Sequence, residues 1–345
     1  MNNYMVYVFE NLIKTTIVCS LAICLLLFLK RYLFKKFSKR FNYYIWLIIV
    51  FRMLLFLFNY TIVYEVKEPK ENILGNNIAQ INISTDNNLM LYVVYLWLFV
   101  TIVIAVYTFI KYTRFKNLVV DVSYDIEDDV NGIYKNLLKE LNIKKKIELR
   151  GSDELISPAG IGLFKSYIFL PDYPYSKDEL TWILKHELMH FKNKDILIKF
   201  LVLSVKIIYW FNPLVYIMSN KVNLDCELCC DESVLTECSL KDKKEYALAL
   251  IKSIKLSKNY NGGILTTEFN KTSLEKRLDS IVKKKGRSGI LMLLILFTLF
   301  SVTYFNFESI SFDNPNFLRN IEILEKSGAN LREEHDYNMK IVYPN

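Results

Sequence analysis

Histidine is scarce in this 345-residue sequence, which contains only three. Two of them, His186 and His190, lie four residues apart in the segment His-Glu-Leu-Met-His, and the third, His335, lies near the C-terminus. On a helix, residues four apart share a face, so both imidazoles can reach one metal ion. Glu187 is then placed to act as a general base beside that ion. H-E-x-x-H also occurs by chance in amphipathic helices, but the scarcity of histidine favours a metal site.

The segment around this motif is predicted to be a helix. Ser176 and Glu179 have the spacing of a capping box, which satisfies the first free amides of a helix. Apolar residues then recur at helical spacing along one face: Leu180, Ile183, Leu184 and Leu188.

Charge is missing from several long apolar runs, although the composition is 52% hydrophobic. Residues 89–110 and 288–305 contain no charged side chain, residues 12–29 contain only Lys14, and residues 42–64 contain only Arg52. Each run approaches the roughly 20 residues that cross a bilayer. These runs predict four transmembrane helices and argue against a soluble protein.

Acidic residues are absent from residues 30–40, where six lysines and arginines follow the first predicted helix. Basic residues favour the cytoplasmic side of a bacterial membrane, so the N-terminus is expected outside. The first helix lacks the basic start and cleavage site of a signal peptide. We therefore expect three transmembrane helices within 1–111, a cytoplasmic domain over 112–287, a fourth helix over 288–305 and an outer tail over 306–345. The net charge of +8 is explained by this bias and not by nucleic-acid binding.

Structural disulfides are not expected. Cys19 and Cys24 lie inside the first predicted helix, and the other four cysteines lie in the predicted cytoplasmic domain, where thiols stay reduced. Two features stay open. Arg52 either faces the interior of the helix bundle or sits nearer an interface. Residues 196–218 form either a buried helix, with Asp195 as its N-cap and a turn at Asn212-Pro213, or a helix pair that enters the membrane and returns.

Three short strands are predicted before the motif helix, over residues 146–150, 155–158 and 166–171. An edge strand in such a sheet can align a substrate backbone by strand addition. The candidate edge is residues 155–164, with Leu155, Ile161 and Leu163 as substrate-facing residues, and a plain core hairpin is the alternative.

A third metal ligand is needed, because a catalytic zinc ion takes three protein ligands and keeps one position open. The predicted cytoplasmic domain has no further histidine, so the ligand must be a carboxylate or a thiolate. Glu227 and Asp231 share one helical face, which suits Glu227 as ligand and Asp231 as hydrogen-bond acceptor for a ligand imidazole. The alternative is a thiolate from Cys226, Cys229 or Cys230, although thiolates favour closed structural sites.

Taken together, these segments resemble the M56 peptidases, the BlaR/MecR antirepressor and sensor group. The resemblance rests on His186–His190, on Phe211-Asn-Pro-Leu-Val215 and on Glu227-Leu-Cys-Cys-Asp231, in that order. It implies a polytopic α-helical membrane protein with a cytoplasmic α+β gluzincin-like zinc peptidase domain, in which Glu227 binds zinc. The tail of 306–345 is too short for the penicillin-binding sensor domain of that group, so covalent β-lactam sensing is not expected.

Three functions follow as hypotheses. The first is a signalling protease in the bacterial membrane that cleaves itself or a cytosolic repressor, with a homodimer allowed. The second is a housekeeping membrane protease of the HtpX or CAAX-processing type. The third is a sensor scaffold with structural zinc and no catalysis, against which the intact Glu187 argues.

Overall fold

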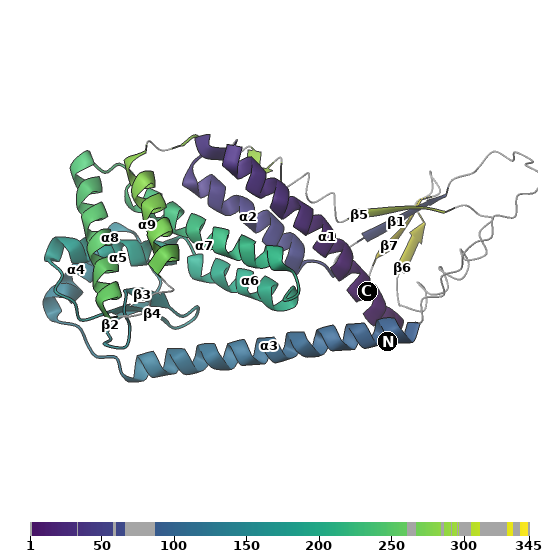
Figure 1. Cartoon of the computed structure of the whole chain (residues 1–345), viewed down its shortest axis with the longest axis horizontal. Coiled ribbons are helices and arrows are strands. Elements are labelled where there is room, and N and C mark those ends of the chain that lie inside the picture. The colour runs from purple at the N-terminus through teal and green to yellow at the C-terminus, as the bar shows by residue number, and fades with distance from the viewer. Residues whose placement is uncertain are drawn as a thin grey trace, which may run out of the picture. The chain divides into compact units, whose positions relative to one another are not determined.

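The computed structural model describes residues 2–32, 34–57, 60–65, 87–260, 267–283, 286–290, 292–294, 296, 305–310, 330–333 and 339–343. The chain divides into two compact units, one of Met1–Cys24, Ile48–Val103 and Ile290–Asn345 and one of Leu25–Leu47 and Ile104–Gly289. The elements are α1 (Asn2–Tyr32), a 3-10 turn (Phe34–Lys36), α2 (Lys39–Leu54), β1 (Tyr60–Glu65), α3 (Asn87–Asp121), α4 (Asp128–Glu140), β2 (Ile147–Gly151), β3 (Ala159–Ile161), β4 (Ser166–Leu170), α5 (Lys177–Lys192), α6 (Asp195–Ile208), α7 (Pro213–Val234), α8 (Leu240–Tyr260), α9 (Thr267–Val282), β5 (Phe305–Ile310), β6 (Asn330–Glu333) and β7 (Met339–Tyr343) (Figure 1).

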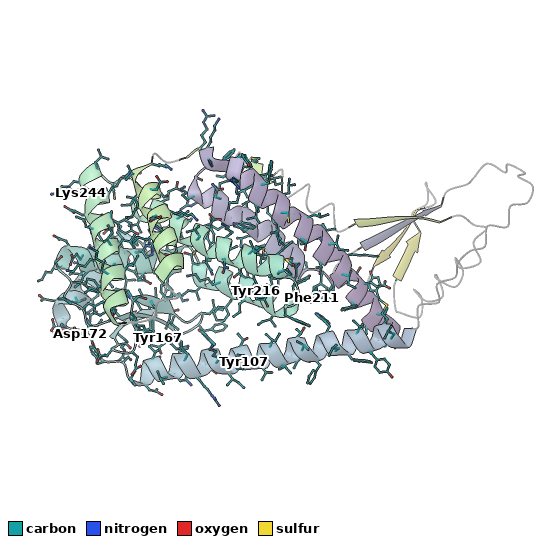
Figure 2. The ribbon with its side chains drawn as sticks, in the orientation of Figure 1. Tyr107, Tyr167, Asp172, Phe211, Tyr216 and Lys244 are labelled. Carbon is teal, nitrogen blue, oxygen red and sulfur yellow. The ribbon has the colours of Figure 1, made fainter. Side chains whose placement is uncertain are left out.

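Two helices of the described chain are long and apolar enough to cross a membrane, Met5–Tyr32 within α1 and Leu89–Asp121 within α3. Large apolar side chains stay exposed along α3, as Tyr107 does in Figure 2. A helix that leaves apolar side chains exposed along its length suits a lipid environment. The first and third predicted membrane helices therefore have counterparts in the structure.

The second predicted helix, over 42–64, differs from the structure. Helix α2 ends at Leu54, and residues 60–65 form strand β1. Of the predicted fourth helix, 288–305, the described residues 290, 292–294 and 296 are helical, and β5 begins at Phe305. The count of four membrane helices stays a prediction.

Arg52 lies on α2 and is buried, and its Nη1 donates a hydrogen bond to Thr15 Oγ1 on α1 at 3.2 Å. The side chain therefore faces the neighbouring helix, which agrees with the first of the two alternatives for this charge.

The first unit contains a four-stranded sheet of order β5-β1-β7-β6. Strand β1 is paired in parallel with β5, from Tyr60 opposite Phe305 to Glu65 opposite Ile310. On its other side it runs antiparallel to β7. Residues 60–65 and the strands after residue 304 must therefore lie on the same side of any membrane that the chain crosses.

The second unit contains a three-stranded sheet of order β2-β4-β3. Strand β4 pairs in parallel with β2 and antiparallel with β3, so β3 is an edge. The predicted strands at 146–150 and 166–171 are confirmed as β2 and β4. The strand predicted over 155–158 is wrong, because the edge strand begins at Ala159, after the turn before Pro158.

The motif helix α5 begins as predicted. Ser176 Oγ accepts a hydrogen bond from the Glu179 amide at 3.3 Å, and a Glu179 carboxylate oxygen accepts one from the Ser176 amide at 2.7 Å. Leu184 and Leu188 are fully buried in the core that α5 shares with α4, the sheet, α7 and α8. This packing fixes which side of α5 faces the core and leaves His186 and Glu187 toward a cleft.

Replacing Ser176 by alanine is expected to destabilise the fold by about 0.5–2 kcal/mol, because one amide of the first turn loses its partner. Thermal unfolding of the detergent-solubilised protein measures the change. Thr181→Ala, inside the same helix, is the matched control and should be nearly neutral because alanine favours helix. Equal losses in both variants would show that the cap contributes nothing specific.

Helices α6 and α7 form a hairpin, and the turn predicted at Asn212-Pro213 is confirmed because α7 begins at Pro213. Lys194, in the left-handed conformation, precedes α6, so Asp195 is the first helical residue and the prediction of Asp195 as N-cap is wrong. Asn212 caps α7 through its side chain, and Pro213 is the first helical residue. At 14 residues α6 is roughly 21 Å long, too short to cross a bilayer. Phe211 and Tyr216 stay partly exposed at this turn (Figure 2).

Helix α7 also contacts the end of α1 and the first part of α2. Asp225 accepts hydrogen bonds from Lys30 Nζ and from Trp46 Nε1, the latter at 2.7 Å. The Glu232 carboxylate accepts the backbone amides of Lys39 and Arg40 at 3.2 Å each, so it caps the start of α2. Residues of the α1–α2 hairpin are thus part of the compact unit that holds α7.

Candidate metal centre and its cleft

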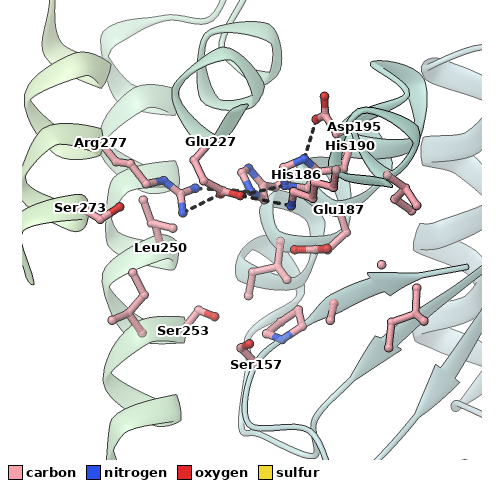
Figure 3. A pocket seen from close by; sticks show the side chains of 18 of the residues that line it. Ser157, His186, Glu187, His190, Asp195, Glu227, Leu250, Ser253, Ser273 and Arg277 are labelled. Carbon is pink, nitrogen blue, oxygen red and sulfur yellow. Dashed lines mark hydrogen bonds and ion pairs between the residues drawn. The ribbon is translucent and has the colours of Figure 1, made fainter. Parts of the chain in front are cut away.

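The two motif histidines and Glu227 converge at one point. His186 and His190 come from consecutive turns of α5, and Glu227 comes from α7, which packs against it (Figure 3). The Nε2 atom of His186 is 3.4 Å from one carboxylate oxygen of Glu227, and the Nε2 atom of His190 is 3.6 Å from the other. The predicted ligand set is therefore brought together from two helices.

These distances test whether the three groups fit a zinc ion. Ligand atoms about 2.0–2.2 Å from a tetrahedral zinc lie about 3.3–3.6 Å from one another. The measured separations match this spacing, whereas they are longer than good hydrogen bonds. Two nitrogens and a carboxylate are also the donor set of catalytic zinc. The donor types and both distances to Glu227 are compatible with the ion, whereas, among the described residues, the groups of three ligand atoms that lie within 4.8 Å of one another contain Cys230 or Cys226 in place of Glu227.

Hydrogen bonds to the opposite ring nitrogens orient both imidazoles. Asp195 Oδ2 lies 2.7 Å from Nδ1 of His190. The hydroxyl of Tyr246 lies 2.8 Å from Nδ1 of His186 and donates to Asp231 at 2.5 Å. With a proton on each Nδ1, each Nε2 carries the lone pair that could bind a metal, and Arg277 Nη2 lies 3.4 Å from the Nε2 of His186.

Asp231, predicted to accept a hydrogen bond from a ligand imidazole, lies 3.4 Å from His186 Nδ1. Its closest link to that ring passes through Tyr246. Arg277 on α9 donates to both oxygens of Asp231, from Nε at 2.9 Å and from Nη2 at 2.7 Å. Asp231 is therefore held by α8 and α9 together, and it connects both helices to the histidine helix.

The acidic groups around the two histidines favour positive charge at the candidate metal centre. Burial disfavours the charged form of His186, yet Cys230 and Glu227 raise its pKa to about 10. Burial also disfavours the charged form of His190. Cys230, Glu227 and Asp195 outweigh this effect and hold the pKa of His190 well above its usual value. Burial would raise the pKa of Glu227, but His190 and Arg277 hold it well below its ordinary range. Such surroundings attract a cation.

Two sets that contain a thiol offer a different site. They are His186 and His190 with Cys230, and His190 and Asp195 with Cys226, and in each set the ligand atoms lie within 4.8 Å of one another. The sulfur atoms approach the Nδ1 atoms, which already bond to Asp195 and Tyr246. Both thiols are buried and do not line the cleft. A catalytic ion needs an open position, so the geometry favours Glu227 over a thiol.

A cleft of about 630 Å³ opens in front of the histidines. Glu187 lines it and points into it below His186, and Leu250 and Ser253 of α8 lie on the other side (Figure 3). Strand β3 forms one wall, and Ile161 is among the lining residues, whereas Leu155 and Leu163 are not. Of the three predicted substrate-facing residues, the structure places one in the cleft.

Three side chains around the histidines were not predicted from the sequence in these roles: Asp195, Tyr246 and Arg277. Arg277 carried a signal, because it lies on the apolar stripe of Leu274, Leu278 and Ile281. A charged residue on such a stripe is buried with a partner. Asp195 and Tyr246 had no such signal, since only the turn after α5 and the packing of α8 bring them to the histidines.

Similarity to known proteins identifies the family of this chain. The family model described as BlaR1 peptidase M56 matches residues 10–281. The chain is 29% identical over 164 residues to the regulatory protein BlaR1 of Bacillus licheniformis, covering 46% of this chain and 27% of that protein. It is 34% identical over 122 residues to the methicillin resistance mecR1 protein of Staphylococcus aureus strain Mu50. That match covers 34% of this chain and 21% of that protein.

A third relative, the regulatory protein BlaR1 of Staphylococcus aureus, is 27% identical over 211 residues, covering 59% of this chain and 36% of that protein. The matches thus span between about a fifth and a third of the relatives' lengths. Because the family model covers well over half of the chain, this protein belongs to the M56 family of metallopeptidases.

Proposed function

We propose that this chain is a membrane zinc endopeptidase that hydrolyses peptide bonds on the cytoplasmic side and signals by cleaving itself or a cytosolic repressor. The observation that carries the proposal is the convergence of both Nε2 atoms on Glu227, at 3.4 and 3.6 Å, in the cleft that Glu187 lines. A regulatory role is supported by the relatives named as regulatory proteins.

Zinc, when bound by His186, His190 and Glu227, supplies a Lewis acid that acidifies water and polarises a carbonyl group. Glu187 then accepts the proton of a water molecule as it adds to the carbonyl carbon, and later gives that proton to the leaving amine. Asp195 and the Tyr246–Asp231 pair hold the imidazoles in the required tautomer.

The cleft favours an extended peptide as substrate. In the three-stranded sheet β3 pairs on one side only, and residues 157–162 line the cleft. A substrate strand added to β3 would hydrogen-bond through its backbone, with little demand on its side chains. Ile161, Leu250 and Leu203 make part of the lining apolar, which suits apolar substrate side chains.

The membrane topology is supported by two features. The spans in α1 and α3 have the length and apolar character of membrane helices. The pairing of β1 with β5 requires residues 60–65 and 305–310 to lie on one side, as the predicted outer loop and outer tail do. We therefore propose an N-terminus outside and a cytoplasmic peptidase unit.

Replacing Glu187 by glutamine is expected to abolish cleavage, because the amide cannot accept the proton of the water. General-base catalysis by one side chain contributes about 10²–10⁴-fold to the rate. Newly made N-termini in cells that express wild type or variant, identified by mass spectrometry, measure the effect. Zinc content should be unchanged. Asp178→Asn, on an exposed position of the same helix, is the matched control and should cleave like wild type.

The same experiment separates the competing functions. An unchanged set of new N-termini in the Glu187→Gln strain would refute the peptidase. A broad set of membrane substrates without any inducing condition would favour a housekeeping protease. The thiol-containing sets are the observation that favours a structural zinc site, and bound zinc without hydrolysis of any substrate would support it.

A further inference from the structure

Two cationic side chains are among the described residues that line the cleft, Arg277 and Lys199. They approach different oxygens of the Glu227 carboxylate. Arg277 Nη1 is 3.1 Å from Oε2, which faces His186, and Lys199 Nζ is 4.0 Å from Oε1, which faces His190. The two cations differ in how many of their hydrogen-bond donors are already engaged.

Arg277 is fully engaged. Its Nε and Nη2 donate to Asp231 and its Nη1 contacts Glu227, so each of its three nitrogens has an acid partner. Its side chain is only 10% exposed. Arg277 is therefore a positioning residue that holds Asp231 and Glu227, with little capacity left for a substrate.

Lys199 has donors to spare. An ammonium group carries three N–H donors. Among the described residues its ion-pair partner is Glu227, at 4.0 Å, which is longer than a hydrogen bond. The Lys199 side chain is 46% exposed and lines the cleft. Lys199 follows Asp195 by one turn of α6, so the helix that orients His190 also presents this ammonium beside it.

We propose that Lys199 is a catalytic residue whose ammonium hydrogen-bonds the carbonyl oxygen of the scissile peptide bond. This inference rests on the proposed function. As the water oxygen adds to the carbonyl carbon, the π electron pair moves onto the carbonyl oxygen, and the water proton goes to Glu187. Lys199 stabilises the charge on that oxygen and keeps its own proton. When the C–N bond breaks, the C=O bond reforms and the amine takes the proton from Glu187.

A purely structural role and a catalytic role for Lys199 predict different effects of its removal on zinc binding. If Lys199 only held Glu227 in place, its loss would weaken zinc binding. A cation close to a metal site repels the metal, so a lysine retained for catalysis should, when removed, leave zinc affinity unchanged or higher. Zinc affinity therefore separates the two roles independently of rate.

The test uses the full-length, zinc-loaded protein in detergent with fluorescein-labelled casein, and then with the casein peptide that wild type cleaves fastest. Lys199→Met is expected to lower kcat by about 10²–10³-fold, the usual effect of losing one donor to an oxyanion, with KM within about twofold. Lys199→Arg should recover part of kcat. Lys206→Met, on the same helix but outside the cleft lining, is the matched control.

Zinc affinity by competition with a chelating dye and unfolding temperature are measured for every variant. If Lys199→Met has the kcat of wild type while Glu187→Gln is inactive, the inference is overturned and the proposed function stands. A fall in kcat that is matched by loss of zinc overturns it as well, since Lys199 then acts through Glu227. A wild-type protein that cleaves neither casein with zinc nor any cellular substrate in the comparison of new N-termini overturns the proposed function and this inference with it.

Discussion

A chain with Glu227 replaced by glutamine is expected to lose its zinc. The amide is a weak ligand, and two imidazoles alone leave the ion without its third protein ligand. Loss of an outer hydrogen-bond partner already weakens zinc sites about 10–100-fold, and loss of a ligand should exceed that. Zinc content after dialysis against a chelator, measured by atomic emission, should fall from one ion per chain to near none, and hydrolysis should stop.

The controls for this prediction lie on the same helix. Cys226→Ala and Cys230→Ala remove the thiols of the two rival ligand sets and should keep the metal. Retention of zinc by Glu227→Gln together with its loss from Cys230→Ala would move the site to the buried face of α7. That result would make zinc structural and would contradict the proposed mechanism.

Replacing Asp231 by alanine is expected to be the most destabilising single change near the site. Asp231 is 1% exposed and is the main partner of the buried Arg277 guanidinium. Removing one member of a buried ion pair leaves the other charge without compensation, which costs about 3–5 kcal/mol. Chemical denaturation of the detergent-solubilised protein measures the loss. Zinc affinity should fall by about 10–100-fold, since the Tyr246 hydroxyl loses its acceptor.

The double variant Asp231→Leu with Arg277→Met separates stability from site geometry. Replacing both charges by apolar side chains of similar size is often neutral or stabilising for a buried pair. The double variant should therefore regain most of the stability without regaining zinc affinity. Recovery of both properties would show that this pair serves only folding, and recovery of neither would point to strain in the new packing.

Local patterns in the sequence were sufficient for the centre of the site. His186, Glu187 and His190 follow from spacing on a single helix, and the capping box and apolar face of that helix are confirmed by the structure. Glu227 was favoured over the nearby thiols by the chemistry of catalytic zinc and by the M56 resemblance, and its oxygens lie 3.4 and 3.6 Å from the histidine Nε2 atoms.

The other side chains around the histidines could not be predicted, because tertiary contacts bring them there and sequence spacing does not encode such contacts. Tyr246 and Arg277 reach His186 from 60 and 91 residues away. The second membrane helix was predicted too long, because the apolar run continues through Tyr60-Thr-Ile-Val-Tyr64, where β-branched and aromatic residues suit a strand as well as a helix. Hydropathy alone does not separate these two outcomes.

The contacts of Asp225 and Glu232 affect how the peptidase can be isolated. A recombinant fragment cut at the predicted boundary of residue 112 would lack Lys30, Trp46 and the start of α2. Two carboxylates on the helix that carries Glu227 would lose their partners in such a truncation. The compact unit that carries the candidate metal centre is therefore discontinuous in sequence, and the α1–α2 hairpin supplies part of it.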